Sequence, residues 1–114
     1  MLIEHFQSGR IIVDGRAYTS DVILWPEGVD DSWWRVENHQ VCPEDLEPIL
    51  NKNPDVVILG AGSSGAMTVA EEALSRLREF CAQVHVEKTE SACALYNELA
   101  GGPDRVVAAL HLSC

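Results

Sequence analysis

The second half of the chain alternates between short apolar runs and amphipathic segments, and this alternation limits the fold more than any other feature. Apolar runs of strand length lie at residues 55–60, 83–87 and 105–111. Between them, residues 69–80 and 89–100 repeat apolar side chains at the spacing of a helix with one buried face. Such alternation with short links is typical of parallel strands joined by right-handed crossovers. This half is therefore predicted to fold as strand–helix–strand–helix–strand.

The first half predicts paired antiparallel strands instead. Asp14-Gly15 separates two strand-like runs, and this dipeptide tolerates the positive φ angles that a tight hairpin turn requires. Further strands are predicted at residues 22–25 and 32–36, on either side of a loop that begins at Pro26. A helix start is predicted near residue 43, where a proline precedes two acidic residues.

The length of the chain, 114 residues, leaves room for one domain with its own core. We expect residues 1–114 to form a single α/β domain, with residues 1–41 rich in hairpins and residues 42–114 forming the α/β half. No apolar run approaches the roughly 18 residues of a membrane span, and the N-terminus lacks the basic and apolar regions of a signal peptide. These features favour a cytoplasmic protein.

A glycine-rich segment, Gly-Ala-Gly-Ser-Ser-Gly at residues 60–65, follows the first buried run and fits the pattern G-x-G-x-x-G. In dinucleotide-binding folds such glycines let the backbone approach the pyrophosphate, and an acidic residue such as Glu87, at the end of the next predicted strand, binds the ribose. The candidate residues for binding a nucleotide or a smaller anion are Gly60, Gly62, Ser63, Ser64 and Gly65.

Three features oppose a dinucleotide at this segment. Thr68 and Glu71 have the spacing of a capping box, which predicts that the first N–H groups of the next helix are bonded to its own side chains. Glu71 and Glu72 would repel an anion from the first helical turn. The chain also has room for only one of the two mononucleotide-binding halves of a dinucleotide fold. We therefore expect a structural turn at residues 60–65 and no cofactor.

The chain is strongly acidic, with 18 Asp and Glu against 8 Lys and Arg and a formal net charge of −10. The basic residues are scattered and form no stripe. Because nucleic acids and anionic membranes reward clustered cations, we expect neither nucleic acid nor membrane as a partner. The acidity favours solubility or a basic partner protein.

The histidines, cysteines and serines show no spacing typical of a metal site or a catalytic centre. His111 and Cys114 could supply two zinc ligands, but a site needs three or four, and no second pair is visible. Ser63 and Ser64 lack the G-x-S-x-G spacing of a nucleophile elbow. We therefore predict no metal and no catalytic residues. Cys114 is a candidate surface residue, because a terminal thiol is expected to be accessible.

Several aromatic and polar residues beside apolar runs are candidates for a surface or a pocket. Trp25 is one of three tryptophans, and we interpret all three as apolar cover for the sheet in preference to a partner-binding face. Asp21 precedes a predicted strand, and Tyr96-Asn97 lies on a predicted helix. Local hydrogen bonding is the simpler interpretation of these polar residues, and a role in a pocket is the alternative.

Short motifs along nearly the whole chain form an ordered pattern. Its members are Tyr18, Asp21, Val22-Ile23-Leu24-Trp25-Pro26, Gly28, Trp34-Arg35, Pro43, Asp45-Leu46, Val57-Ile58-Leu59-Gly60, Gly62, Thr89, Tyr96-Asn97, Leu99, Arg105-Val106, His111 and Cys114. This pattern resembles the small α/β domain of the adipogenesis-associated protein family. A related domain occurs in an assembly factor of mitochondrial respiratory complex I.

The resemblance implies a three-layer fold with a mixed central sheet, in which the C-terminal half is similar to a truncated nucleotide-binding fold. It brings no catalytic residues, because the family is largely of unknown function and its better-known members are similar to assembly or regulatory proteins. We therefore expect a non-enzymatic binding or assembly module that contacts an unknown protein partner. The alternative is a small-molecule, anion or nucleotide-binding protein, similar to a vestigial oxidoreductase, that uses residues 60–65.

Overall fold

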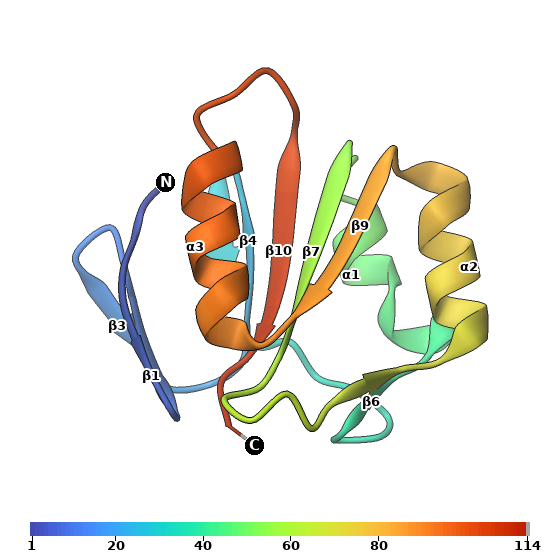
Figure 1. The fold of residues 1–114 in the computed structure, drawn as a ribbon, viewed down its shortest axis with the longest axis horizontal. Coiled ribbons are helices and arrows are strands. Elements are labelled where there is room, and N and C mark those ends of the chain that lie inside the picture. Colours follow the sequence, from blue (N-terminus) through green and yellow to red (C-terminus); the bar gives the residue numbers. More distant parts are fainter. Residues whose placement is uncertain (114) are drawn as a thin grey trace.

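A five-stranded mixed sheet forms the centre of the computed structural model, which describes residues 1–113 (Figure 1). The strand order is β5-β4-β10-β7-β9. The strands are β4 (Val22–Trp25), β5 (Gly28–Asp30), β7 (Val56–Ala61), β9 (Gln83–Glu87) and β10 (Val106–His111). β7 pairs in parallel with β10 and β9, whereas β4 pairs antiparallel with β10 and β5. The mixed sheet that the resemblance implies is confirmed.

Helices and a small second sheet cover the two faces of the central sheet. One face carries α3 (Thr89–Leu99) and the antiparallel sheet β1-β2-β3, and the other carries α1 and α2 (Figure 1). The bounds are β1 (Ile3–Gln7), β2 (Arg10–Val13), β3 (Arg16–Tyr18), the short 3-10 helix η1 (Pro43–Asp45), α1 (Glu47–Leu50) and α2 (Glu71–Phe80). The three-layer α/β architecture is confirmed.

The side chains of β7 explain why its sequence is apolar without interruption. Val56 and Ile58 pack toward α3 and the small sheet, whereas Val57 and Leu59 pack toward α1 and α2. Both sets are fully buried or nearly so. A strand covered on both faces gains the transfer free energy of every side chain, roughly 1.5–3 kcal/mol for each large one.

The Asp14-Gly15 hairpin is confirmed, because both residues have positive φ angles, 48° and 80°, between the paired strands β2 and β3. The strand predicted at residues 32–36 is wrong. The partner of β4 on this side is β5, which follows directly after the turn at Pro26. Residues 32–36 form no strand, so the turn at Pro26 is tighter than the sequence suggested.

The predicted capping box at Thr68 and Glu71 is also wrong. Thr68 lies in a short strand, β8 (Thr68–Val69), which pairs in parallel with β6 (Gln40–Val41). Its N–H donates to the carbonyl of His39 at 2.9 Å. α2 begins only at Glu71, and no side chain caps it. The backbone of Thr68 is engaged in a ladder with a segment distant in sequence, and this pairing overrides the local capping signal.

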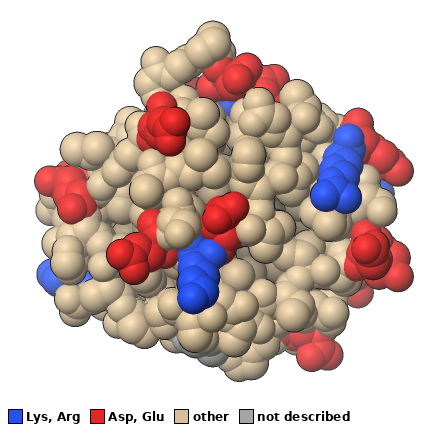
Figure 2. All heavy atoms as spheres, in the orientation of Figure 1, with Lys and Arg blue, Asp and Glu red and all other residues tan. Residues whose placement is uncertain are grey.

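The surface is acidic and the chain is tightly folded. The radius of gyration is 12.4 Å, close to the roughly 13 Å expected for about 100 residues. Acidic side chains are spread over the face shown in Figure 2, and the basic side chains there stand apart from one another. No helix within residues 1–113 has both the length and the apolar character needed to cross a membrane.

Candidate functional site

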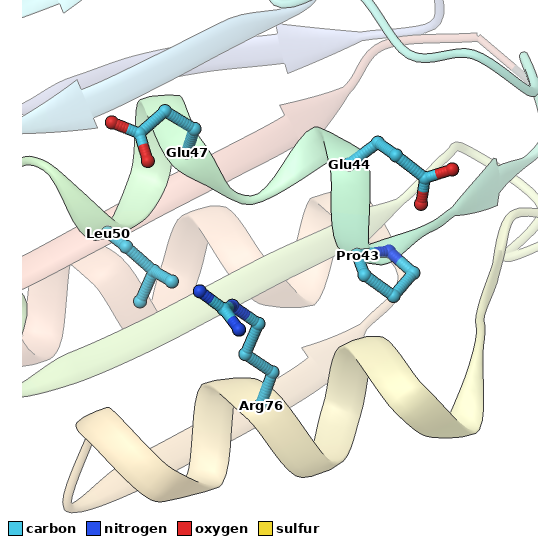
Figure 3. Close-up of a pocket in the computed structure, with 5 residues that line it drawn as sticks. All are labelled: Pro43, Glu44, Glu47, Leu50 and Arg76. Atoms are coloured by element: carbon cyan, nitrogen blue, oxygen red, sulfur yellow. The ribbon is translucent and has the colours of Figure 1, made fainter.

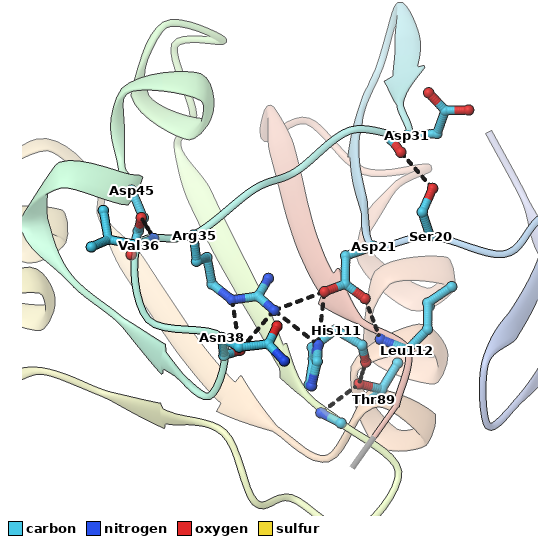
Figure 4. A network of polar contacts seen from close by, with 11 residues as sticks. Ser20, Asp21, Asp31, Arg35, Val36, Asn38, Asp45, Thr89, His111 and Leu112 are labelled. Atoms are coloured by element: carbon cyan, nitrogen blue, oxygen red, sulfur yellow. Dashed lines mark hydrogen bonds and ion pairs between the residues drawn. The ribbon is translucent and has the colours of Figure 1, made fainter.

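Polar side chains from three distant segments meet at the carboxyl end of β10 (Figure 4). Asp21 precedes β4, Arg35 lies in the irregular segment before β6, and His111 ends β10. Arg35 Nη2 donates to Asp21 Oδ2 at 2.8 Å, and His111 Nδ1 lies 2.7 Å from the same oxygen. The N–H of Leu112 donates to Asp21 Oδ1 at 2.8 Å. Both carboxylate oxygens of Asp21 are therefore engaged.

The contacts of His111 assign its proton. A carboxylate only accepts hydrogen bonds, so the short contact with Asp21 places the proton on Nδ1. The guanidinium of Arg35, 3.0 Å from the same nitrogen, then donates to Asp21 rather than to the ring. Nε2 is buried and has no partner within residues 1–113. A histidine oriented by an aspartate can act as a general base, but a buried Nε2 offers no position for a substrate.

The carboxyl group of Asp21 is held in its charged form. Partial burial alone would raise its pKa, but hydrogen bonds from His111, from the N–H of Leu112 and from Arg35 outweigh that effect and lower the pKa below its ordinary value. Arg35 is almost fully buried, with 2% of its side chain exposed. Removing one partner of such a pair costs about 3–5 kcal/mol, because the other charge is left buried and uncompensated.

Arg35 also fixes the segment that carries it. Its Nε and Nη2 donate to the carbonyl of Asn38 at 3.2 and 2.9 Å, and its Cζ lies 4.5 Å from the centroid of the Trp33 ring. Trp33 is buried, whereas Trp34 points outward and is 75% exposed. The interpretation of the tryptophans as apolar cover is thus confirmed for Trp33 and for the half-buried Trp25, and is wrong for Trp34.

The hydroxyl of Thr89 joins this network to the glycine-rich segment. It donates to the carbonyl of His111 at 2.6 Å and accepts from the N–H of Gly62 at 2.9 Å. A Cβ on Gly60 would lie 2.9 Å from Thr89 Oγ1 and 2.9 Å from Leu110 Cδ2. Gly60 is therefore needed because the first turn of α3 packs directly on β7.

The backbone of the glycine-rich segment, residues 60–65, is held by hydrogen bonds within the protein. Gly62 and Gly65 have positive φ angles of 96° and 76°, which favour glycine, and the N–H of Gly65 donates to the carbonyl of Gly62 at 3.2 Å. Ser63 Oγ lies 3.3 Å from Ser8 Oγ. β8 separates the segment from α2, so the N-terminus of the helix that follows in the sequence does not adjoin the glycines. The N-terminus of α3 does lie beside Gly62, but Thr89 in its first turn is bonded to that glycine. Residues 60–65 form a turn whose geometry differs from the dinucleotide fingerprint.

The other candidate residues lie apart from the network. Tyr96 is buried against the small sheet, and burial, assisted by the charge of Asp14, raises its pKa to about 12. Asn97 accepts from the N–H of Ile3 at 2.9 Å and donates to the carbonyl of Ile3 at 2.7 Å, so it fastens β1 to α3. Asn97 is thus a structural hydrogen-bonding residue, but its partner lies 94 residues away, so the prediction of local bonding is wrong for it.

Trp25 and Cys114 are the remaining candidate surface residues. Trp25 is half-buried and carries the ammonium of Lys52 over its ring, 4.4 Å from the centroid. Cys114 lies outside the described residues. Within residues 1–113, no group of three or more His, Cys, Asp or Glu side chains is placed to hold a metal ion.

An open groove between α1 and α2 contains none of the candidate residues that lie within residues 1–113 (Figure 3). One part, of about 360 Å³, is lined by Pro43, Glu44, Glu47, Leu50 and Arg76. An adjoining part, of about 450 Å³, is lined by Glu47, Leu50, Asn51, Asn53, Arg76 and Phe80. Because two strands, β7 and β8, lie between α1 and α2 in the sequence, no local motif indicates this groove.

The charged side chains of the groove form no hydrogen bond or ion pair within the described chain. Within residues 1–113, the side chain of Arg76 makes no hydrogen bond or ion pair. Its guanidinium carbon Cζ lies over the ring of Phe80, 5.7 Å from the ring centroid. Figure 3 shows Arg76 reaching toward the gap between Leu50 and Pro43, with the carboxylate of Glu47 directed away from it. Phe80 is 61% exposed. The groove thus combines apolar surface with charges that have no partner inside the described chain.

Comparisons with known proteins place this fold without naming an activity. A family model described as "Protein of unknown function (DUF498/DUF598)" matches residues 3–111. The crystal structure of the conserved hypothetical protein PH1505 from Pyrococcus horikoshii is 27% identical, with a TM-score of 0.86 and full coverage, 100%, of both chains. The structure of MT938 is 25% identical, with a TM-score of 0.78 over 99% of this chain and 98% of that one.

A third structure shows the shared fold alone. A Mth938-like domain from Bordetella pertussis, solved by solution NMR, is 18% identical, with a TM-score of 0.64 over 97% of this chain and 85% of that one. The descriptions of these three structures give no substrate, ligand or partner.

Proposed function

The chain belongs to the DUF498/DUF598 family of proteins of unknown function, and from this premise we propose that it is a non-enzymatic binding or assembly module that contacts another protein. The contact surface is the groove between α1 and α2. Its occupant is a segment of a basic partner that inserts an apolar side chain and flanks it with lysine or arginine.

The observation that carries this proposal is the contrast between buried and exposed polar groups. Both carboxylate oxygens of Asp21 are bonded within the protein, and Arg35 bonds there through Nε and Nη2. Nη1 of Arg35 and Nε2 of His111 have no partner within residues 1–113, but both are buried and closed to a partner protein. The side chains of Arg76 and Glu47 make no hydrogen bond or ion pair within residues 1–113, although both line a groove with exposed apolar surface at Phe80. Unpaired polar groups beside exposed apolar surface are the features through which a protein binds a segment of a partner.

Charge selects the kind of partner. Glu44 and Glu47 stand at the groove, and the chain as a whole carries a net charge of −10. Complementary charge steers association and disfavours acidic competitors. Arg76 can in turn donate hydrogen bonds to a backbone carbonyl of the same segment. The resemblance to the adipogenesis-associated family, with a related domain in a complex I assembly factor, also favours contacts with proteins over catalysis.

The alternative function, binding of a small anion or nucleotide at Gly60, Gly62, Ser63, Ser64 and Gly65, rests on the G-x-G-x-x-G pattern. Against it, the N–H of Gly62 donates to Thr89, and that of Gly65 donates to Gly62. An anion bound there would have to replace these bonds.

Peptide binding tests the proposal directly. A panel of short peptides is compared in which a leucine or phenylalanine is flanked by lysine and arginine, or by glutamate and aspartate. We expect the basic peptides to bind, measured by fluorescence anisotropy, and to shift the NMR signals of Leu50, Arg76 and Phe80. Reversing one wall charge with Glu47→Lys should weaken binding about tenfold, which corresponds to loss of one close charge pair.

The matched control is Glu98→Lys, the same charge change at an exposed position of α3 on the opposite side of the sheet. Equal weakening by both variants would mean that only net charge matters. If no basic peptide binds, while nucleotides or phosphate raise the melting temperature and shift the amide signals of residues 60–65, the alternative function replaces this one.

A further inference from the structure

The outer edge of β9 is the most open backbone edge of the molecule. β9 is the last strand of the central sheet, and its only strand partner within residues 1–113 is β7. Its exposed face includes Val86, which is 42% exposed. An uncovered edge presents unpaired N–H and C=O groups and acts as a template for another strand.

The other edges of the two larger sheets carry features that block such pairing, and β6 and β8 have only two residues each. β5, at the opposite edge of the central sheet, has three residues and begins with Gly28. β1 has an irregular register between Ile3 and His5, and its first residue is bonded to Asn97. β3 also has three residues and begins with Arg16. β9 has five residues and contains no proline, glycine, lysine or bulge. Apart from Glu87 at its end, it therefore lacks the usual protection of an edge.

The register of β9 determines which backbone groups face outward. The N–H of Gln83 donates to the carbonyl of Asp55 at 3.3 Å, and Gln83 lies opposite Val56 in the parallel ladder. Because parallel pairing uses alternate residues, the groups of Gln83, His85 and Glu87 bond to β7. The N–H and C=O groups of Val84 and Val86 consequently point to the open edge.

The sequence of β9, Gln-Val-His-Val-Glu, is nearly symmetric about its central residue. An antiparallel copy centred on His85 places Val84 opposite Val86 of the second copy, and each such pair exchanges two backbone hydrogen bonds. On the other face, Gln83 lies opposite Glu87, and His85 lies opposite His85. Apolar residues then meet apolar residues, and polar residues meet polar residues.

We propose that two copies of this chain pair through the outer edges of β9, antiparallel and centred on His85, to form one continuous ten-stranded sheet from two five-stranded sheets. Four backbone hydrogen bonds and two valine pairs hold the two copies. The partner at this edge is thus a second copy of the chain. Among the antiparallel registers that pair the outward N–H and C=O groups of Val84 and Val86, only one overlaps all five residues of β9, and in that register the strand is complementary to itself.

Sedimentation equilibrium of the purified chain tests self-association. A small interface of this kind is weak, so the measurement spans from about 10 µM to about 1 mM protein. Salt of about 0.15 M limits the repulsion between the acidic chains, because the Debye length is then about 8 Å. We expect a monomer–dimer equilibrium in this range. A chain that stays monomeric throughout overturns the proposal.

Two substitutions at one position test the register. Gln83→Glu places a carboxylate opposite Glu87 of the other copy and should weaken the dimer by about five-fold, whereas Gln83→Lys should tighten it by a similar factor. The double variant Gln83→Glu/Glu87→Lys restores opposite charges and should recover the affinity lost by Gln83→Glu.

The control is Gln7, which contacts His5 on β1 at 3.2 Å as Gln83 contacts His85 on β9 at 3.0 Å. Gln7→Glu and Gln7→Lys should leave dimerisation equally strong. Hydrogen exchange gives an independent measure: the amides of Val84 and Val86 should gain protection as concentration rises, while those of His85 and Glu87 stay constant. Dimerisation that ignores the Gln83 charge, or that leaves Val84 and Val86 unprotected, contradicts the β9 interface.

Discussion

Arg35 and Arg76 carry the same charge in opposite surroundings. Arg35 is buried, pairs with Asp21 at 2.8 Å and binds the carbonyl of Asn38. Arg76 lies on the exposed face of α2 at an open groove, against the ring of Phe80. Burial makes an arginine part of the fold, because its charge must be compensated inside the protein. Exposure beside apolar surface leaves the second arginine available to a partner.

The comparison predicts different consequences of mutation at the two places. Changes in the network of Asp21, Arg35 and His111, or in Thr89 and Gly60 behind it, should cost stability. Changes in the groove should affect binding and leave the fold intact. The following predictions test this division from the largest expected effect to the smallest.

Removing the buried arginine has the largest expected effect. Arg35→Ala should lower the free energy of unfolding by about 3–5 kcal/mol, because Asp21 loses its cationic partner in a partly buried position. Urea denaturation measures this loss. Arg35→Lys keeps the charge but not the two-fold contact with Asn38, so it should recover only part of the loss. An unfolding free energy unchanged by Arg35→Ala would remove the distinction between the two arginines.

Removing the hydroxyl of Thr89 should have the next largest effect. Thr89→Val keeps the shape but leaves the N–H of Gly62 and the carbonyl of His111 without their buried partner. The expected loss is about 2–3 kcal/mol in the free energy of unfolding, since an unsatisfied buried group costs about 1–3 kcal/mol. Thr89→Ser retains the hydroxyl and should lose less. Equal losses for valine and serine would indicate that packing, not hydrogen bonding, matters here.

A methyl group at Gly60 tests the close approach of α3 to β7. Gly60→Ala should cost about 1–3 kcal/mol, because the new Cβ meets Thr89 Oγ1 and Leu110 Cδ2 at 2.9 Å. The control is Gly101→Ala, where no atom lies within 4 Å of the added Cβ. Thermal unfolding of both variants gives the comparison. If Gly60→Ala unfolds at the wild-type temperature, the close approach of α3 to β7 is not what requires glycine at this position.

Acidification should weaken the network through Asp21. Its pKa is lower in the folded chain than in the unfolded chain, so its stabilising contribution is fully present above the unfolded value of about 3.9 and is lost as the pH falls through the folded value. Stability measured by urea denaturation should therefore fall below about pH 4. Asp21→Asn should be less stable at neutral pH and should show a shallower fall in acid.

The smallest effect is expected in the groove. Arg76→Ala should change the free energy of unfolding by less than about 0.5 kcal/mol, because surface substitutions away from buried features are usually nearly neutral. Urea denaturation provides the measurement, and binding of the basic peptides provides the contrast. A large loss of stability in Arg76→Ala would show that the groove is part of the fold rather than a surface for a partner.

The candidate site was only partly predictable from the sequence. The sequence singles out Asp21 and the glycines at 60 and 62, with hydrogen bonding and a structural turn preferred over a pocket or a ligand site. The structure gives them internal hydrogen bonds and close packing, although the partners of Asp21 are distant in sequence. Arg35, His111 and Thr89 appeared only within the family pattern. Asp21 lies 14 residues from Arg35 and 90 from His111, and the carbonyl that Thr89 bonds lies 22 residues from it, so no local spacing reveals these contacts.

Local patterns determined the elements whose character depends on their own residues. The uninterrupted apolar run of β7, the Asp14-Gly15 turn and the amphipathic face of α3 each specify a conformation through side-chain periodicity or φ preference. Tertiary structure decided the rest. Thr68 joined a strand instead of capping a helix, because a distant segment offered its backbone a hydrogen bond, and the groove formed where two helices distant in sequence met.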